Sequence, residues 1–250
     1  MPRRLSKSGF YHIVFRGVNH CHLFEEREDY ERLLKTLAVI KAELPIDLYA
    51  YCLMSNHAHL LIQESKPGDI THAMRRLLVS YACWFNKKYQ RSGSLISNRY
   101  KSECVEDNSY LLILARYIHQ NPLKAGVTRF IADYPWSSYR DYTSSSTTLS
   151  DIELMLDMFS ENREEAVRQF IEFHKALDDV DRSLPDRRRR SEEQARAGMI
   201  EALGGIEPSA VIGLDKQERN LLLMALRKGG FSIRQIERVT GISRGVIARM

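Results

Sequence analysis

Two apolar, strand-like runs separated by only two residues constrain the fold of this chain more than any other feature. The runs are Ile46 to Met54 and His57 to Ile62, and the residues between them, Ser55 and Asn56, suit a tight turn. Strands joined by so short a connection pair side by side in opposite directions. The sequence therefore predicts a β-hairpin, and with it an antiparallel sheet.

Helical and strand-like segments precede and follow this hairpin. In chain order we expect a strand over Tyr11 to Val18, a helix over Glu25 to Leu44, the hairpin, a helix over Asp69 to Tyr89, a strand over Arg99 to Val105, and a helix over Ser109 to about Asn121. Pro45 should end the first helix, Asp107 or Asn108 should cap the last one, and Pro122 should stop it. This order predicts an α+β domain of the ferredoxin-like kind, an antiparallel sheet with helices packed on one face.

The rest of the chain is predicted to be helical. The Ser/Thr run from Thr143 to Thr148 should end the first domain, which we place at residues 1–142. Residues 143–191 should form a linker and a helical extension, in which the basic run Arg187 to Arg190 reads as solvated. Residues 192–250 should form a separate helical module. With 44% hydrophobic residues in 250, the chain can fill one sizeable core and a smaller one.

Charge and cysteine usage limit the class of protein. The formal net charge of +5 is compatible with a polyanionic partner, although many basic proteins have none. The four cysteines form no closely spaced pair, which argues against a zinc knuckle or a disulfide framework and favours a reducing compartment such as the cytoplasm. No run of about 20 apolar residues occurs, so we expect no membrane span.

The sharpest local feature is the pair His57 and His59. Alternate residues of a strand face the same way, so both imidazoles should lie on one side of the sheet and could bind one metal ion. In a chain with eight histidines such a pair can also be coincidence. His20 and His22 have the same spacing, but they lie in a polar turn and are predicted to be part of a loop. The isolated histidines are expected to be structural or on the surface; they are His12, His72, His119 and His174.

A second feature lies near the end of the last predicted helix. Tyr117 and Asn121 are one helical turn apart and should share a face, whereas His119 should face elsewhere. Two imidazoles, an amide oxygen and a phenol suit phosphodiester transfer. Mg²⁺ or Mn²⁺ can polarise the scissile phosphate, and tyrosine can form a covalent phosphotyrosine. The sequence does not identify the base that would activate Tyr117.

These blocks resemble the REP-associated tyrosine transposases, relatives of the single-tyrosine HUH transposases of bacterial insertion elements. The resemblance runs from about Phe10 to Tyr142 and is carried by Tyr11-His12-Ile13-Val14-Phe15-Arg16-Gly17, Met54-Ser55-Asn56-His57-Ala58-His59-Leu60-Leu61 and Tyr117-Ile118-His119-Gln120-Asn121-Pro122-Leu123-Lys124-Ala125-Gly126. It implies an HUH domain that cuts single-stranded DNA beside hairpins and leaves a 5′-phosphotyrosine and a free 3′-hydroxyl. It also implies Tyr117 as nucleophile and His57, His59 and Asn121 as metal ligands. Ser55 departs from the family pattern, in which proline is common.

Other side chains near these blocks have two interpretations each. Tyr110 is a rival nucleophile, but core packing is favoured because Leu114, four residues on, cannot hold a metal. Five polar or basic residues flank the blocks and could contact phosphates, or be ordinary surface: Arg16, Asn19, Arg99, Lys101 and Lys124.

The C-terminal residues carry the spacing of a helix-turn-helix. Ile236, Gly241, Ile242, Ile247 and Met250 fall at the expected positions, with Gly241 in the turn. Ser243 would cap the second helix, on or near which Arg244 and Arg249 could contact duplex DNA. The alternative is an ordinary helical hairpin.

Three functions are compatible with these features. The leading one is a metal-dependent enzyme that nicks and transfers single-stranded DNA. The alternative is a domesticated regulator that binds hairpin DNA with little or no cleavage. A plasmid relaxase or rolling-circle initiator shares the histidine pair, but the continuation from Asn121 to Gly126 favours the transposase branch. The sequence leaves open whether the protein is a monomer or a homodimer.

Overall fold

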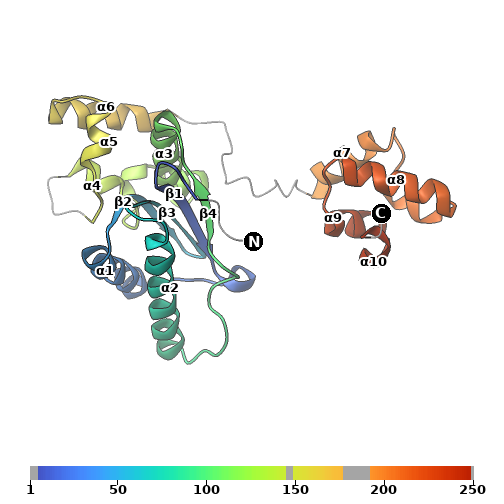
Figure 1. The fold of residues 1–250 in the computed structure, drawn as a ribbon, viewed down its shortest axis with the longest axis horizontal. Helices are drawn as coiled ribbons and strands as arrows, with labels where there is room; N and C mark the ends of the chain where they lie inside the picture. Colours follow the sequence, from blue (N-terminus) through green and yellow to red (C-terminus); the bar gives the residue numbers. More distant parts are fainter. Residues whose placement is uncertain (1–4, 145–148, 177–191, 249–250) are drawn as a thin grey trace. The chain divides into compact units, whose positions relative to one another are not determined.

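The computed structural model describes residues 5–144, 149–176 and 192–248. The chain forms two compact units, residues 1–181 and 182–250 (Figure 1). Each unit has a hydrophobic core of its own.

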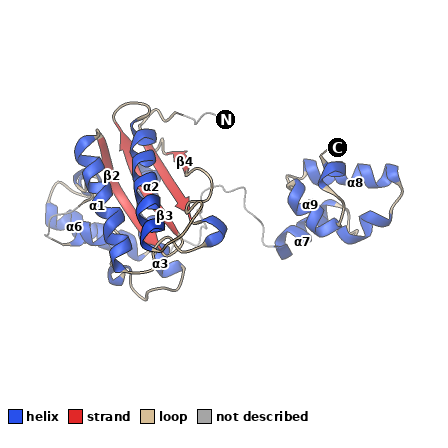
Figure 2. Cartoon of the chain, turned by 90° about the horizontal axis from the view of Figure 1, so that it is seen from below, coloured by secondary structure: helices blue, strands red, loops and turns tan. Residues whose placement is uncertain are grey.

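A four-stranded antiparallel sheet forms the centre of the first unit (Figure 2). Its strands are β1 (Phe10–Arg16), β2 (Ile46–Met54), β3 (His57–Glu64) and β4 (Lys101–Cys104), and they lie in the order β2-β3-β1-β4. The β2–β3 pair is the predicted hairpin, with Met54 opposite His57 across the turn. The prediction of an α+β domain with an antiparallel sheet is thus confirmed.

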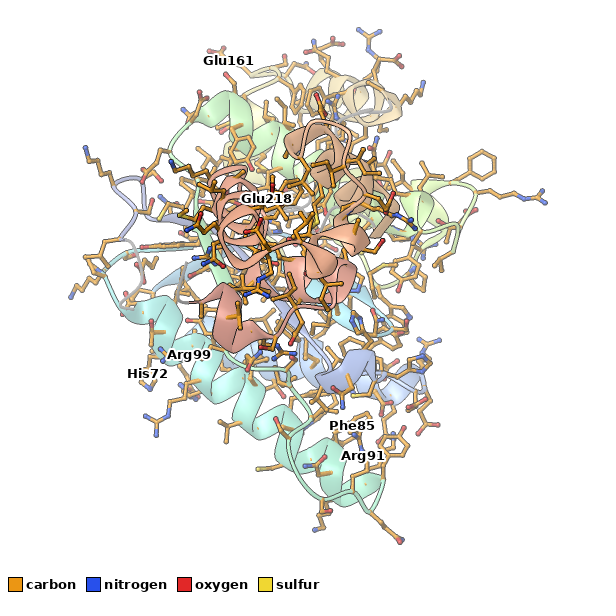
Figure 3. The ribbon with its side chains drawn as sticks, turned by 90° about the vertical axis from the view of Figure 1, so that its right-hand side faces the viewer. His72, Phe85, Arg91, Arg99, Glu161 and Glu218 are labelled. Carbon is orange, nitrogen blue, oxygen red and sulfur yellow. The ribbon has the colours of Figure 1, made fainter. Side chains whose placement is uncertain are left out.

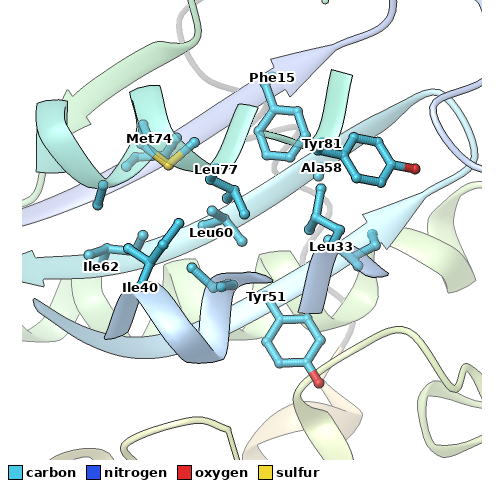
Figure 4. Close-up of a cluster of buried hydrophobic side chains, with 14 of the residues drawn as sticks. Phe15, Leu33, Ile40, Tyr51, Ala58, Leu60, Ile62, Met74, Leu77 and Tyr81 are labelled. Carbon is cyan, nitrogen blue, oxygen red and sulfur yellow. The ribbon is translucent and has the colours of Figure 1, made fainter. Parts of the chain in front are cut away.

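Helices cover both faces of this sheet. Helices α1 (Arg27–Glu43) and α2 (Asp69–Lys88) pack on one face, where Leu33 and Leu77 meet Leu60 of β3 (Figure 4). Helix α3 (Asn108–Lys124) packs on the other, against Cys52 and Leu61. The prediction of helices on one face was wrong. Strand β2 is buried at every position but one, since its apolar run is continuous rather than alternating and needs cover on both sides.

Helix α3 begins as predicted and ends later than predicted. Asp107 caps it by accepting hydrogen bonds from the backbone N–H groups of Ser109 and Tyr110. Pro122 was expected to stop the helix but lies inside it. Proline removes one N–H donor, yet the last turn is closed by hydrogen bonds from Ala125 N–H to the Asn121 carbonyl and from Val127 N–H to the Pro122 carbonyl. Asn121 therefore keeps a helical position.

The first unit extends past the predicted boundary at residue 142. It contains the short helices η1 (Val18–His20), η2 (Ile131–Asp133), α4 (Tyr139–Thr143) and α5 (Glu153–Asp157), and the longer α6 (Arg163–Lys175). Phe170 of α6 is fully buried in the same core as α3. Asp151 accepts hydrogen bonds from Leu48 N–H and Lys41 Nζ, at 2.8 and 2.7 Å. The helices after residue 149 complete the core on the α3 face, so the compact unit is longer than the predicted domain.

A buried chain of hydrogen bonds joins α6 to α3. His174 Nδ1–H donates to the Phe170 carbonyl at 2.9 Å, so its Nε2 accepts from His119 Nδ1–H, also at 2.9 Å. His119 Nε2 then accepts from the Ser138 hydroxyl at 2.7 Å. His119 faces away from the histidine pair, as predicted.

The second unit is helical. It contains α7 (Glu192–Ala202), η3 (Pro208–Gly213), α8 (Lys216–Lys228), α9 (Ile233–Thr240) and α10 (Arg244–Ile247) around a core that includes Leu226 and Ile236. Ser232 and Gln235 form a capping box at the start of α9, and Gly241 follows it with φ of 74°. The basic run Arg187 to Arg190 and the residue Arg249 lie outside the described residues. None of the helices in the described ranges is long and apolar enough to cross a membrane.

Candidate functional site

His57 and His59 lie on β3 and share the face of the sheet that α3 covers. In the strand register, His59 stands opposite Val14 and Cys52, and His57 stands opposite Arg16. Their ring centroids are 5.1 Å apart. The pleat of the strand therefore brings the two imidazoles together, as the spacing of two residues predicts.

One ring nitrogen of each histidine is held by a neighbour. His57 Nδ1 lies 2.7 Å from Asn56 Oδ1, so it must carry the proton and donate to this oxygen. His59 Nδ1 lies 3.0 Å from Nε2 of His12, on the adjacent strand β1. Both contacts use Nδ1, which makes Nε2 the nitrogen of each ring that remains for a ligand.

The surroundings keep both histidines neutral. Burial and the positive charge of Arg16 together lower the pKa of His57 to about 4, while the Asn121 side chain has the opposite effect on this pKa. Burial also lowers the pKa of His59 well below its usual value, as do the nearby His12 and His57. Neutral imidazole is the form that binds metal ions, so no proton must leave before ligation.

Helix α3 brings Tyr117 and Asn121 to the same place. The Tyr117 ring is 5.7 Å from the His59 ring and 6.2 Å from the His12 ring, with edge-to-face geometry in both pairs. Asn121 Nδ2 donates to the Tyr117 carbonyl at 2.9 Å. Because the amide nitrogen of Asn121 is engaged in this hydrogen bond, its side-chain oxygen is the atom that can act as a ligand beside His57.

These donors fit a small divalent cation. Two neutral imidazoles and one amide oxygen converge, and N and O ligands of this kind are used by Mg²⁺ and Mn²⁺. Within the described ranges, no group of three or more His, Cys, Asp or Glu side chains could hold a metal ion. The Asn121 amide oxygen lies outside that set of residue types and is a third donor beside the two imidazoles.

Basic side chains surround the histidine–tyrosine group. Arg16 is exposed beside His57, and Lys101 stands opposite Val14 on β4, which places it on the same face. Lys124 Nζ lies 5.1 Å from the centre of the Tyr117 ring. These cations give the surface beside the histidine–tyrosine group a positive charge.

The two remaining predicted contacts are exposed residues near the same end of β1. Asn19 follows β1 in η1 and has φ of 50°, a left-handed conformation that is uncommon for a residue other than glycine. Arg99 lies in the connection between α2 and β4 (Figure 3). Two residues earlier in that connection, Ser97 N–H donates to the Arg16 carbonyl.

Two other predicted features can be placed. Tyr110 packs against the core on the α3 face, in agreement with its structural interpretation. In the second unit, exposed Arg244 forms an ion pair with Glu237 of α9.

Two residues of this site were missed by sequence reasoning. His12 was considered an isolated structural or surface histidine, yet it is fully buried and contacts His59 directly. Asn56 was considered only as a turn residue, and it orients His57. His12 alternates along β1 with Val14 and Arg16 and therefore faces the same side of the sheet. Once β1 is paired with β3, this alternation predicts that His12 lies beside His59.

Known proteins resemble this chain in sequence and in fold. Residues 6–121 match the model of the family "Transposase IS200 like". A Haemophilus influenzae protein named as a REP-associated tyrosine transposase is 27% identical over 151 residues, which cover 55% of this chain and 83% of that protein. A solved REP-associated tyrosine transposase, bound to a REP hairpin, has a similar fold, with a TM-score of 0.50 at 15% identity over 61% of this chain and 94% of its own. The resemblance seen in the sequence is therefore confirmed: residues 6–121 of this chain are similar to the IS200-like transposase family.

Proposed function

We propose that this protein is a metal-dependent single-strand DNA endonuclease and strand transferase that cuts beside DNA hairpins through Tyr117. A transposase role is supported by the family and by the names of its relatives. The observation that carries the proposal is the position of the Tyr117 ring, 5.7 Å from the His59 ring, on the same helix as Asn121, whose side chain influences the pKa of His57.

The proposed reaction is a transesterification. The Tyr117 oxygen attacks the phosphorus of the scissile phosphodiester and loses its proton, and the bond from phosphorus to the 3′ oxygen breaks. The 3′ oxygen takes up a proton and leaves as a free hydroxyl, while the 5′ phosphate stays on Tyr117. Because one phosphodiester replaces another, the bond energy is kept, and a 3′-hydroxyl can later reverse the step and join a new strand.

His57, His59 and Asn121 would hold Mg²⁺ or Mn²⁺ in this proposal. The ion, when bound, neutralises charge on the scissile phosphate. The chain's own contribution is orientation. Asn56 and His12 hold the two imidazoles, and α3 presents its phenol and its amide from one face.

The proposed substrate is single-stranded DNA that contains a hairpin. This is supported by the related protein solved with a REP hairpin and by the cations around the site. Arg16, Lys101 and Lys124 would contact backbone phosphates near the cut, with Asn19 and Arg99 further along the strand. Such contacts strengthen binding without reading sequence and weaken as salt increases.

For the second unit we propose a helix-turn-helix that binds duplex DNA. The support is the succession of α9, a left-handed Gly241 and α10, with Ser243 at the start of α10. Arg244 is exposed on α10 and paired with Glu237, so it would exchange this carboxylate for a DNA phosphate or guanine edge. Helix α10 spans only Arg244–Ile247 among the described residues.

The covalent adduct tests the proposal. Hairpin single-stranded DNA labelled on the 3′ side of the cut should migrate with the protein on a denaturing gel, and label on the 5′ side should be released. Tyr117→Phe removes only the phenol oxygen and should abolish the adduct while it preserves packing and hairpin binding.

Tyr110→Phe is the matched control, because Tyr110 lies on the same helix and packs in the core; it should still form the adduct. Adduct formation by Tyr117→Phe would assign the nucleophile to another residue. No adduct with the wild-type protein on any hairpin substrate would favour the DNA-binding regulator.

A further inference from the structure

His12 lies directly behind a proposed metal ligand. It is 1% exposed, and its ring stacks on the His59 ring with centroids 5.2 Å apart and planes inclined by 18°. Its Nε2 is 3.0 Å from His59 Nδ1. A neutral pair at this distance shares one hydrogen, which sits on one nitrogen or the other.

Ligation of a metal decides where this hydrogen sits. For His59 Nε2 to bind a cation, the proton of this ring must be on Nδ1, which then donates to His12 Nε2. The His12 ring must in turn carry its own proton on Nδ1. The reverse arrangement, with His12 Nε2–H donating, would leave a proton on His59 Nε2 and block ligation.

The second strand partner of His12 offers an acceptor for that remaining proton. His12 Nδ1 and Glu103 Oε2 are both buried, and neither has a hydrogen-bond partner among the residues that the structure describes. His12 and Glu103 stand directly opposite each other in the β1–β4 register and therefore share a face. Side chains so placed have Cβ atoms about 4.5–5.5 Å apart, within reach of a carboxylate and an imidazole. Buried polar groups are rarely left unpaired, so this coincidence of a donor and an acceptor needs a reason.

We propose that Glu103 and His12 are positioning residues that hold His59 in its metal-binding tautomer, through a chain in which His59 Nδ1–H donates to His12 Nε2 and His12 Nδ1–H donates to Glu103. This hydrogen-bond chain rests on the proposed metal site, and it accounts for the orientation and tautomer of His59 in that site. Carboxylate and histidine groups behind metal ligands serve this purpose in metalloproteins generally, because they set the ring orientation and increase ligand basicity.

The affinity of the full-length protein for Mn²⁺, measured without DNA, tests this hydrogen-bond chain. His12→Phe keeps a ring but removes the acceptor, and should increase the Mn²⁺ dissociation constant about 10–100-fold. His12→Gln restores an acceptor near the position of Nε2 and should recover most of the affinity. Glu103→Gln should weaken binding less than His12→Phe does.

The effects of substitutions at His12 and Glu103 on Mn²⁺ affinity, measured singly and together, distinguish a role in orienting His59 from a role in packing. The double variant His12→Phe/Glu103→Gln should bind Mn²⁺ no more weakly than His12→Phe alone, since Glu103 acts only through His12. His72→Phe, at an exposed histidine of α2, is the control and should leave the dissociation constant unchanged. Urea unfolding without metal shows whether each variant is folded. If His12→Phe is not folded, Glu103→Gln alone carries the test, and an unchanged Mn²⁺ dissociation constant in that variant would overturn the proposal.

The outcomes distinguish this inference from the function it rests on. If the wild-type protein binds no Mn²⁺, both the proposed metal site and the hydrogen-bond chain behind it are refuted. If the wild type binds Mn²⁺ and His12→Phe binds it equally well, only the chain is overturned. Equal losses in His12→Phe and His12→Gln would also overturn it, because packing and not the accepted hydrogen bond would then hold His59.

Discussion

Replacing His174 by phenylalanine should make the first unit less sensitive to acid. His174 is 2% exposed, and its two nitrogens bond to the Phe170 carbonyl and to His119. Burial lowers the pKa of His174 to about 3, whereas a histidine in an unfolded chain titrates near 6.5. The folded protein thus keeps this ring neutral at a pH where the unfolded chain would protonate it.

The size of the effect follows from this difference in pKa. The unfolded chain takes up a proton below about 6.5, and the folded unit does not until about 3. The stability due to neutral His174 is therefore fully present above about pH 6.5 and is lost as the pH falls through this window. Between pH 7.5 and 5.5 the loss amounts to about 1.4 kcal/mol from this one residue.

His174→Phe removes this pH-dependent loss of stability and adds a destabilisation that does not depend on pH. A phenyl ring can occupy the same space beside Phe170, whose ring centroid is 4.0 Å away. The His119 Nδ1–H loses its acceptor, which costs about 1–3 kcal/mol at either pH. The variant should therefore be less stable than the wild type at pH 7.5, and the difference should shrink by about 1.4 kcal/mol at pH 5.5.

Tryptophan fluorescence can measure the stability of the first unit in the full-length protein at both pH values. Both tryptophans, Trp84 and Trp136, lie in the first unit, so urea unfolding monitored by their emission reports on that unit. His72→Phe, at an exposed position, should differ from the wild type equally at both pH values. If the difference between His174→Phe and the wild type is also equal at pH 7.5 and 5.5, His174 does not change protonation on unfolding and the reasoning fails.

Two further predictions concern the metal and the second unit. His57→Ala or His59→Ala should reduce DNA cleavage to background without unfolding the protein, as should excess EDTA with the wild type; full nicking in EDTA, scored on a denaturing gel, would refute the metal ligands. Deletion of residues 182–250 should weaken binding to duplex DNA about tenfold or more at matched salt, or about 1.4 kcal/mol, and leave cleavage of a saturating short hairpin nearly unchanged. Equal affinity of the two proteins would identify the second unit as an ordinary helical module.

Local patterns predicted the elements well because each depends on neighbouring residues alone. The turn at Ser55 and Asn56, the cap at Asp107 and the shared face of Tyr117 and Asn121 are all of this kind. Pro122 shows the limit of a local rule. A proline near a helix end removes one hydrogen bond, but the following backbone N–H groups closed the last turn, so the general preference against proline did not decide the boundary.

His12 could not be assigned from the sequence because its role depends on strand register. It lies 47 residues from His59 along the chain, and nothing within β1 distinguishes it from a packed core residue. Only the pairing of β3 with β1, and of β1 with β4, places His12 opposite Glu103 and diagonally next to His59 on the same face of the sheet. The relevant information is carried by three strands together, and none of them contains it separately.

The same reasoning explains why the unit that carries the site extends beyond the family-matched segment. Tyr117 and Asn121 use one side of α3, and other side chains of that helix bind α6. Arg116 donates to the Phe173 carbonyl at 3.0 Å, and Gln120 donates to the carbonyls of His174 and Ala176 at 2.9 Å each. These are carbonyls at the C-terminal end of α6, which have no partner within their own helix, so α3 caps α6 while α6 fixes α3 from behind. A shift of α6 would move the phenol and the amide relative to the histidines on the sheet, and the geometry of the site therefore depends on residues up to 176 although the family model ends at residue 121.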